Sequence, residues 1–185
     1  MNRREVPLPT FDVVRDPLWN NIRLDPDALA LVDTPAVQRL RYVRQLGHAF
    51  LVYPGATHTR FEHALGAYHL ARRALAQLGE MAGEGKATID PDEARLVRLA
   101  ALLHDIGHYP FSHALEEAGL PRHEGLAERH LMGGELAAVL ERLGIRPERL
   151  LALIRGGGAE ATRRSPASFR ARWMWTSSTT CRATP

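Results

Sequence analysis

The sequence has one cysteine, Cys181, among 185 residues, so no disulfide can form within the chain. It also lacks an apolar run of the roughly 20 residues that cross a bilayer. Residues 1–14 contain two arginines but no continuous apolar core of the kind found in signal peptides. These absences exclude a disulfide scaffold, predict no membrane span and indicate a cytoplasmic protein in a reducing compartment.

Acidic residues are missing from the last part of the chain. Residues 161–185 hold five arginines and no Asp or Glu. The formal net charge of +3 therefore comes from this tail, because residues 1–160 carry 19 basic and 21 acidic residues. We predict no nucleic-acid partner, since a nucleic-acid surface requires basic residues patterned over the folded body.

The remaining composition is that of a folded protein, with 45% hydrophobic and 24% charged residues. Its length fits one domain. Thr59 with Glu62, and Asp90 with Glu93, have the spacing of helix capping boxes. Apolar periodicity predicts helices over residues 34–47, 59–78, 90–105, 125–144 and 146–156, and a short extended segment with a turn over 48–58. With no internal repeat and no alternation of strands with helices, we predict an all-α fold.

The segment LAALLHDIGHYPFSH, residues 99–113, places His104 and Asp105 side by side at the end of an apolar helix. A divalent ion in a hydrolytic site takes imidazole nitrogens and carboxylate oxygens and leaves positions for water. Neighbouring side chains on a helix point about 100° apart, so both can reach one ion only where the helix ends. Gly107 is the predicted end. The alternative is that His104 packs in the core and Asp105 belongs to a turn.

Four motifs follow one another along the chain: QRLRYVRQLG at 38–47, VYPGATHTRFEH at 52–63, RFEHALG at 60–66 and LLHDIGHYPFSH at 102–113. Together they resemble the motifs of HD-domain phosphohydrolases. The set is similar to the deoxynucleoside triphosphate triphosphohydrolase branch, which includes the SAM-and-HD-domain enzymes. The resemblance runs from about Val13 to Ile154, and it implies an all-α HD-domain helical bundle, truncated at its C-terminus, over residues 1–155.

The resemblance also implies a divalent metal ion (Mg, Mn, Fe, Zn or Ni) held by His63, His104, Asp105 and a distant aspartate. In the family, a metal-activated water attacks the α-phosphorus of a deoxynucleoside triphosphate and releases deoxynucleoside and triphosphate. One alternative is an HD-domain hydrolase of another nucleotide phosphoester. Another is a non-catalytic HD module that binds nucleotide or nucleic acid. A homo-oligomer is compatible with the resemblance.

Catalytic roles are implied for three further residues. His108 matches a family histidine that works on the substrate phosphates, so we expect it to donate a proton or to stabilise the leaving oxygen electrostatically. His123 and Glu124, in PRHEG, resemble a further catalytic pair. For His123 the alternative of an ordinary loop histidine stays open.

Substrate contacts are implied for four residues. Gln45 and Leu46 match positions that contact the deoxyribose. Arg60 resembles a phosphate clamp, and His113 resembles a phosphate-contacting histidine. Arg60 as a surface charge on the first helical turn is the alternative, although a cation there opposes the helix dipole. For His113 an ordinary loop histidine is equally open.

Four other histidines carry no such implication, and we expect them to be structural or exposed. They are His48, His58, His69 and His130.

The last 30 residues depart from the family pattern. Family members carry a segment close to SGPLDVDxLDYLxRD after these helices, and its second aspartate is the fourth metal ligand. This sequence has no such segment. It continues instead as ATRRSPASFRARWMWTSSTTCRATP from residue 161.

The genetic code allows this tail to be tested directly. Trp173, Met174, Trp175 and Thr176 must be encoded TGG-ATG-TGG-AC. Read from the last base of the first codon, these bases spell GAT-GTG-GAC, which is Asp-Val-Asp. We therefore predict a shift of reading frame between about residues 156 and 170, with 156–185 translated out of frame. A divergent, disordered C-terminus is the alternative. The chain as written is expected to bind metal weakly and to have little or no triphosphatase activity.

Overall fold

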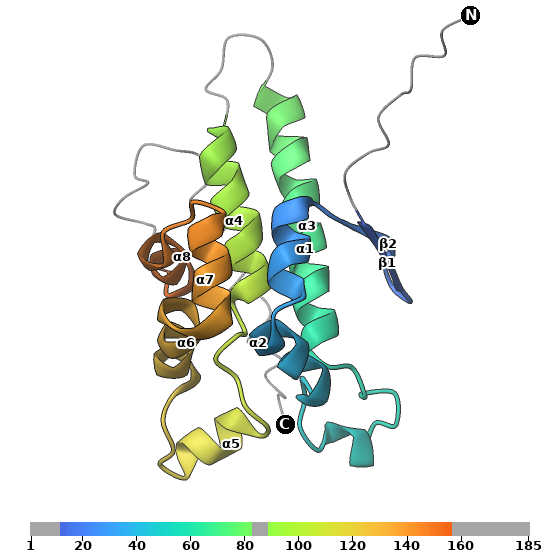
Figure 1. The fold of residues 1–185 in the computed structure, drawn as a ribbon. Helices are drawn as coiled ribbons and strands as arrows, with labels where there is room; N and C mark the ends of the chain where they lie inside the picture. The colour runs from blue at the N-terminus through green and yellow to red at the C-terminus, as the bar shows by residue number, and fades with distance from the viewer. Residues whose placement is uncertain (1–11, 83–88, 157–185) are drawn as a thin grey trace, which may run out of the picture.

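The computed structural model describes residues 12–82 and 89–156 (Figure 1). Strands β1 (Asp12–Asp16) and β2 (Asn20–Leu24) form an antiparallel hairpin in which Asp12 lies opposite Leu24. The α-helices of the described part are α1 (Pro26–Val32), α2 (Pro35–Gln38), α3 (Arg60–Ala82), α4 (Pro91–Leu103), α5 (Ser112–Glu117), α6 (His123–Met132), α7 (Gly134–Arg142) and α8 (Pro147–Ile154), with two 3-10 helices, η1 (Arg39–Tyr42) and η2 (Ala49–Leu51). The predicted all-α fold is confirmed. The out-of-frame segment predicted for 156–185 lies almost entirely outside the described residues.

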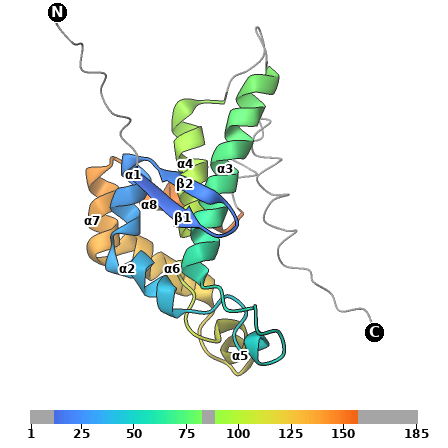
Figure 2. The ribbon, with the colours of Figure 1, turned by 90° about the vertical axis from the view of Figure 1, so that its right-hand side faces the viewer.

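Helices α3 and α4 run antiparallel along each other and form the centre of the bundle (Figures 1 and 2). Helix α8 packs on α4, α6 packs on α7 and α8, and β2 contacts α1 and α3. The last five residues of α4, 99–103, are all buried. A helix that is apolar on every side lies within a core. The C-terminal end of α4 therefore lies in the middle of the molecule, and residues 105–108 that follow it are buried.

The capping box predicted at the start of α3 and the Asp90 cap predicted at the start of α4 are confirmed. The backbone N–H of Thr59 donates to Glu62 Oε2 at 2.6 Å, and the Glu62 N–H donates to Thr59 Oγ1 at 3.3 Å. This reciprocal pair is a capping box that starts α3 at Arg60. At α4 the Asp90 carboxylate accepts from the Asp92 N–H at 2.9 Å. The helix that carries His63 and the helix that precedes His104 are thus fixed by local sequence.

Two predicted helices are shorter than expected. The helix predicted over 34–47 ends at Gln38 and continues as η1 only to Tyr42. Val43 is extended, and Arg44 pairs with Thr59 in an antiparallel bridge. The helix predicted over 125–144 is broken into α6 and α7 at Gly133, whose φ of −146° is not helical. The apolar pattern by itself favours a continuous helix in both places. A backbone bridge interrupts the first helix, and a glycine interrupts the second.

Other elements were not predicted. The hairpin and α1 were not foreseen, and residues 48–58 contain the 3-10 helix η2 in place of an extended segment. Within the described ranges 12–82 and 89–156, no helix combines the length and apolar character needed to cross a membrane.

Asp25 connects three elements beside the core. Its carboxylate accepts from the Ala28 N–H at 2.9 Å, from Tyr68 Oη at 2.8 Å and from Arg98 Nε at 2.8 Å. Burial alone would raise the pKa of Asp25, but these three donors lower it below the ordinary value. The ionised carboxylate therefore stabilises the junction of α1, α3 and α4.

We expect Asp25→Asn to lower the free energy of unfolding at pH 7 by about 1.5–3 kcal/mol, because a charge-assisted hydrogen-bond set is lost. The folded-state pKa is lowered, so the wild-type contribution is complete above the unfolded pKa and is lost as the pH falls through the folded value. Urea unfolding at pH 7 and near pH 3 should show the difference shrinking in acid. The exposed Asp12→Asn on β1 is the control, and equal effects of both substitutions would contradict the assignment.

Candidate metal centre

His104 and Asp105 lie where α4 ends. The helix stops at Leu103, and His104 is its C-cap residue. The next residues form a tight turn in which the N–H of Ile106 donates to Leu103 O and the N–H of His108 donates to Asp105 O, both at 3.0 Å. The helix end predicted from the adjacent His-Asp pair is present, although it falls before Gly107. Because the chain leaves the helical path here, two neighbouring side chains reach one point.

Gly107 has a different function from the predicted helix stop. A Cβ placed on Gly107 would lie 2.0 Å from the carbonyl oxygen of His123 and 2.5 Å from the nitrogen of Ala127. The backbone of α6 therefore crosses the turn in direct contact with it. Glycine is required at this position so that the first turn of α6 can approach the end of α4.

Three potential ligand groups converge at this point. His63, in the first turn of α3, places Nε2 3.1 Å from His104 Nε2 and 4.0 Å from Asp105 Oδ2. His104 Nε2 lies 3.2 Å from Asp105 Oδ1. An ion with bonds of about 2.1 Å separates adjacent ligand atoms by roughly 3.0–3.4 Å. The two separations to His104 Nε2 lie in this range, and the 4.0 Å from His63 Nε2 to Asp105 Oδ2 is longer. Imidazole nitrogens and a carboxylate are ligands that divalent ions accept.

The protonation states also suit a metal. His104 Nδ1 lies 2.8 Å from the carbonyl oxygen of Ala101, which can only accept, so Nδ1–H donates there and Nε2 is the nitrogen that faces His63 and Asp105. Burial and the neighbouring His104 lower the pKa of His63, which favours the neutral imidazole. Burial opposes ionisation of Asp105, but His104, His108 and Arg60 hold its pKa well below the ordinary value. These residues could hold a divalent metal ion.

Arg60 lies against this carboxylate. Its Nη1 donates to Asp105 Oδ2 at 2.7 Å, and the residue is only 4% exposed. The alternative of a surface charge is therefore wrong. The ion pair gives a structural reason for a cation in the first turn of α3, and the phosphate contact implied by the resemblance stays a prediction.

A second group of polar side chains adjoins His63, His104 and Asp105, which we call the triad. His108 Nε2 lies 3.4 Å from Asp105 Oδ1, and its ring stacks on that of His123 with centroids 3.8 Å apart and an interplanar angle of 16°. His123 Nδ1 and its backbone N–H both bond to Glu116 Oε1, at 2.8 and 3.0 Å. His113 Nδ1 lies 3.8 Å from the other oxygen of Glu116. We call His108, His113, Glu116 and His123 the histidine cluster.

Glu116 is a site residue that was not predicted from the sequence. It stands three residues after His113 on α5, a spacing that places two side chains on one helix face, and this signal could have identified it. Glu124 lies farther from the expected partner, with Oε2 3.7 Å from His123 Nδ1. The carboxylate that orients His123 in this structure is therefore Glu116.

The histidine cluster is less suited to a metal than the triad is. His108, Glu116 and His123 offer ligand atoms within 4.8 Å of one another. Imidazole lone pairs lie in the ring plane, however, and the rings of His108 and His123 are nearly parallel, so their lone pairs do not converge. His108 Nδ1 is also bonded to Ser112 Oγ at 2.5 Å. The arrangement suits proton transfer and phosphate binding better than metal ligation.

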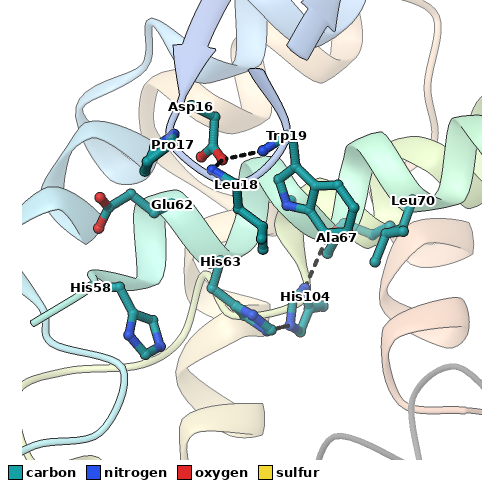
Figure 3. A pocket seen from close by; sticks show the side chains of 12 residues that line it. Asp16, Pro17, Leu18, Trp19, His58, Glu62, His63, Ala67, Leu70 and His104 are labelled. Atoms are coloured by element: carbon teal, nitrogen blue, oxygen red, sulfur yellow. Dashed lines mark hydrogen bonds between the residues drawn. The ribbon is translucent and has the colours of Figure 1, made fainter. Parts of the chain in front are cut away.

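A pocket of about 450 Å³ opens beside the triad (Figure 3). Its walls come from the hairpin turn 16–19 and one face of α3, and His63 and His104 lie together at one side of it. Trp19, whose ring crosses Gly66 of α3, supplies an aromatic surface. A ligand bound in this pocket would contact the triad directly.

The residues implied to contact deoxyribose lie elsewhere. Gln45 and Leu46 stand on the loop between η1 and η2 and do not line this pocket. Gln45 Oε1 is buried without a hydrogen-bond partner in the described part of the chain. Leu46 is 52% exposed.

The histidines without an implied role have varied environments. His48 stacks on Phe111 with ring centroids 4.4 Å apart, and His69 lies 5.4 Å from Trp19. His58 is exposed and lines the pocket beside the triad. Burial lowers the pKa of His130.

A helical bundle that gathers two histidines and an aspartate at the end of a buried helix has a group of side chains that could hold a metal ion. The chain belongs to the HD-domain family, whose model matches residues 60–157. This confirms the family predicted from the four sequence motifs.

Known proteins agree with this assignment. The chain is 36% identical over 163 residues to the deoxynucleoside triphosphate triphosphohydrolase SAMHD1 of Homo sapiens, covering 82% of this chain and 26% of that protein. It is 42% identical over 107 residues to an uncharacterized protein of Methanocaldococcus jannaschii, covering 58% of this chain and 21% of that protein. The chain thus spans about a quarter of the length of these curated relatives.

Solved structures show the same fold. A phosphohydrolase from Bacteroides thetaiotaomicron superposes with a TM-score of 0.66 at 34% identity, covering 79% of this chain and 35% of that one. A hypothetical protein from Aquifex aeolicus gives a TM-score of 0.65 at 38% identity, covering 79% and 38%. Family and neighbours together support a hydrolase.

Proposed function

We propose that the protein is a divalent-metal-dependent phosphohydrolase that converts a deoxynucleoside triphosphate and water to deoxynucleoside and triphosphate. The observation that carries this proposal is the contact between two groups of residues. The potential metal ligand Asp105 lies 3.4 Å from His108, which belongs to the histidine cluster. A phosphate bound across this contact would meet a metal on one side and imidazoles on the other. Similarity to SAMHD1 supports the substrate class.

His63, His104 and Asp105 would hold the ion, which supplies a bound water of lowered pKa. Burial lowers the pKa of His108 to about 4, although Asp105 opposes this. His108 is thus neutral at pH 7, which favours a hydrogen-bonding, charge-stabilising role over proton donation. His123 is the better proton donor, because Glu116 binds its Nδ1 and leaves Nε2 for the leaving oxygen.

We expect Glu116→Gln to lower kcat for triphosphate release by about 10-fold or more, because a neutral amide cannot stabilise a positively charged His123 as a carboxylate does. The neighbouring Glu117→Gln is the matched control, since Glu117 is exposed at the end of the same helix. Steady-state rates with dGTP measure the effect, with both substitutions made in the chain whose reading frame beyond residue 156 has been restored. Equal rates for the two variants would show that Glu116 has no part in proton transfer.

The reaction itself is tested by incubating the frame-restored chain, in which the Asp-Val-Asp codons are read in frame, with dGTP and each divalent ion and separating the products. Deoxyguanosine and triphosphate support the proposal. Release of dGMP and pyrophosphate would contradict it. A panel of nucleoside monophosphates and cyclic phosphodiesters tests the alternative HD-domain hydrolase, and salt-dependent binding of oligonucleotides tests the non-catalytic module.

The reading frame proposed for residues 156–185 requires its own test. Sequencing the gene past codon 156 decides whether the Asp-Val-Asp codons can be joined to the upstream frame. We expect a frame-restored chain to bind metal more tightly and to turn over dGTP faster than the chain as written. Equal metal content and equal turnover would contradict the proposed fourth ligand.

Self-association is a further expectation. The stretch from η1 to the start of α3 exposes five large apolar side chains: Tyr42, Leu46, Leu51, Val52 and Tyr53. Exposed apolar side chains concentrated in one segment favour association. Light scattering after size-exclusion chromatography measures the oligomeric state.

A further inference from the structure

Arg39 reaches from the start of η1 to the turn that follows α4. Its Nη1 donates to the carbonyl oxygen of His108 and its Nη2 to that of Ile106, both at 2.7 Å. The two carbonyls flank Gly107 and are 67 and 69 residues away in the sequence. One side chain therefore ties the N-terminal segment to the turn between the triad and the histidine cluster.

The shape of the guanidinium explains this contact. Carbonyls at and just beyond a helix C-terminus have no partner within the helix. A planar guanidinium presents parallel N–H donors in a fixed fork, which matches two carbonyl oxygens held in one turn. A lysine ammonium has no such fork.

The contact also has an energetic cost. Arg39 is half-buried, and burial lowers its pKa. Its Nε is buried without a hydrogen-bond partner, and no carboxylate forms an ion pair with it in the described part of the chain. Burying a cation is unfavourable unless specific contacts compensate. Here the compensation comes from the two carbonyls of the turn.

This turn carries both halves of the candidate site. Arg39 bonds to the carbonyls at the two ends of the segment 106–108. Asp105 immediately precedes this segment, and the N–H of His108, its last residue, donates to Asp105 O. Arg60 bonds to the Asp105 side chain, whereas Arg39 bonds to the backbone. We propose that Arg39 is a positioning residue that fixes this backbone. It thereby holds the Asp105 carboxylate toward the metal site and the His108 imidazole against the His123 ring.

The first test uses the metal-free protein. Arg39→Met removes both hydrogen bonds and keeps an unbranched side chain. Arg41→Met is the control, because Arg41 lies on the same 3-10 helix, is exposed, and contacts Phe61 and Gln38 rather than the turn. We expect hydrogen exchange of the amides of residues 106–108 to rise about 10-fold in Arg39→Met and to stay unchanged in Arg41→Met.

The second test uses Co²⁺ as a spectroscopic probe of the triad. Loss of a group that orients a ligand weakens metal binding by about 10–100-fold. We expect Arg39→Met to weaken Co²⁺ binding by at least 10-fold and to alter its visible absorption band, with a smaller effect for Arg39→Lys. Arg41→Met should leave both unchanged.

Two results would overturn the proposal. One is unchanged exchange and unchanged Co²⁺ affinity in Arg39→Met. The other is faster exchange over the whole molecule with normal Co²⁺ affinity of the folded fraction, which indicates a merely structural role.

If Arg39→Met does not fold, Arg39→Ala with added guanidinium replaces it. Restored Co²⁺ affinity with guanidinium but not with ammonium supports the proposal, and no difference between the two ions contradicts it. The inference rests on the proposed function only for the position of the metal. If Co²⁺ binding depends on Arg39 as expected but the frame-restored chain does not hydrolyse dGTP, the proposed reaction is refuted and the positioning role of Arg39 stands.

Discussion

Asp105→Asn is expected to reduce the affinity for divalent metal more than any other single substitution considered. The substitution keeps the volume of the side chain but removes the negative charge and one oxygen from a triad whose other two members are imidazoles. Loss of a residue that merely orients a ligand costs about 10–100-fold in affinity, so loss of the carboxylate itself should exceed about 100-fold. Elemental analysis after dialysis and titration with Co²⁺ measure the effect.

The same substitution should also destabilise the metal-free protein. Arg60 is 4% exposed, and its Nη1 bonds to Asp105 Oδ2 at 2.7 Å. An uncompensated buried charge costs about 3–5 kcal/mol. Urea unfolding in the presence of a chelator should show a loss of this size. The double variant Asp105→Asn with Arg60→Met should recover part of the stability but none of the metal affinity.

Asp27→Asn provides the control for this experiment. Asp27 also pairs with an arginine, Arg95, at 2.6 Å, but both side chains are partly exposed to solvent. Its removal should cost about 1 kcal/mol or less and should leave metal binding unchanged. If Asp105→Asn binds metal as well as Asp27→Asn does, the triad is not the metal site.

Gly107→Ala is expected to have the second large effect. The added methyl group would meet the His123 carbonyl at 2.0 Å and the Ala127 nitrogen at 2.5 Å, and both atoms belong to the backbone of α6. Backbone of a packed helix cannot rotate aside, so α6 must move away from the end of α4. Overpacking of this severity should cost about 3 kcal/mol or more.

The displacement should affect the site as well as stability. His123, in the first turn of α6, stacks on His108 at 3.8 Å, and a shift of α6 would separate the two rings. We expect a loss of hydrolysis larger than the loss of folded protein.

Gly79→Ala is the control for Gly107→Ala. Gly79 lies within α3, and a Cβ there would have nothing within 4 Å. Alanine in a helix interior is favoured over glycine by about 0.8–1 kcal/mol, so this variant should be slightly more stable. Thermal unfolding of both variants shows whether the signs differ. A Gly107→Ala protein as stable as Gly79→Ala would contradict the close approach of α6.

Local sequence patterns identified those features that depend on neighbouring residues. The capping box of Thr59 and Glu62 starts α3, and the Asp90 cap starts α4. The adjacent His104 and Asp105 indicated a helix end, and the structure ends the helix there. These features follow from hydrogen bonds and side-chain directions within a few residues, so the sequence contains all the information they need.

Features that join distant segments were not accessible in this way. Propensity favoured a continuous helix over 34–47, but the bridge between Arg44 and Thr59 ends it after η1. Glu116 was missed because the spacing that links it to His113 is common on helices. Its bond to His123 depends on how α5 meets α6.

The sequence by itself determined the helical class, the starts of the two central helices, the family and the residue types of the candidate metal site. Tertiary structure alone decided which atoms meet. It placed His63 Nε2 3.1 Å from His104 Nε2, buried Arg60 against Asp105, and directed Arg39 to the carbonyls beside Gly107. The physical reason is that capping and periodicity are short-range, whereas ion pairs and hydrogen bonds across some 40–70 residues exist only after burial of the core has brought the helices together.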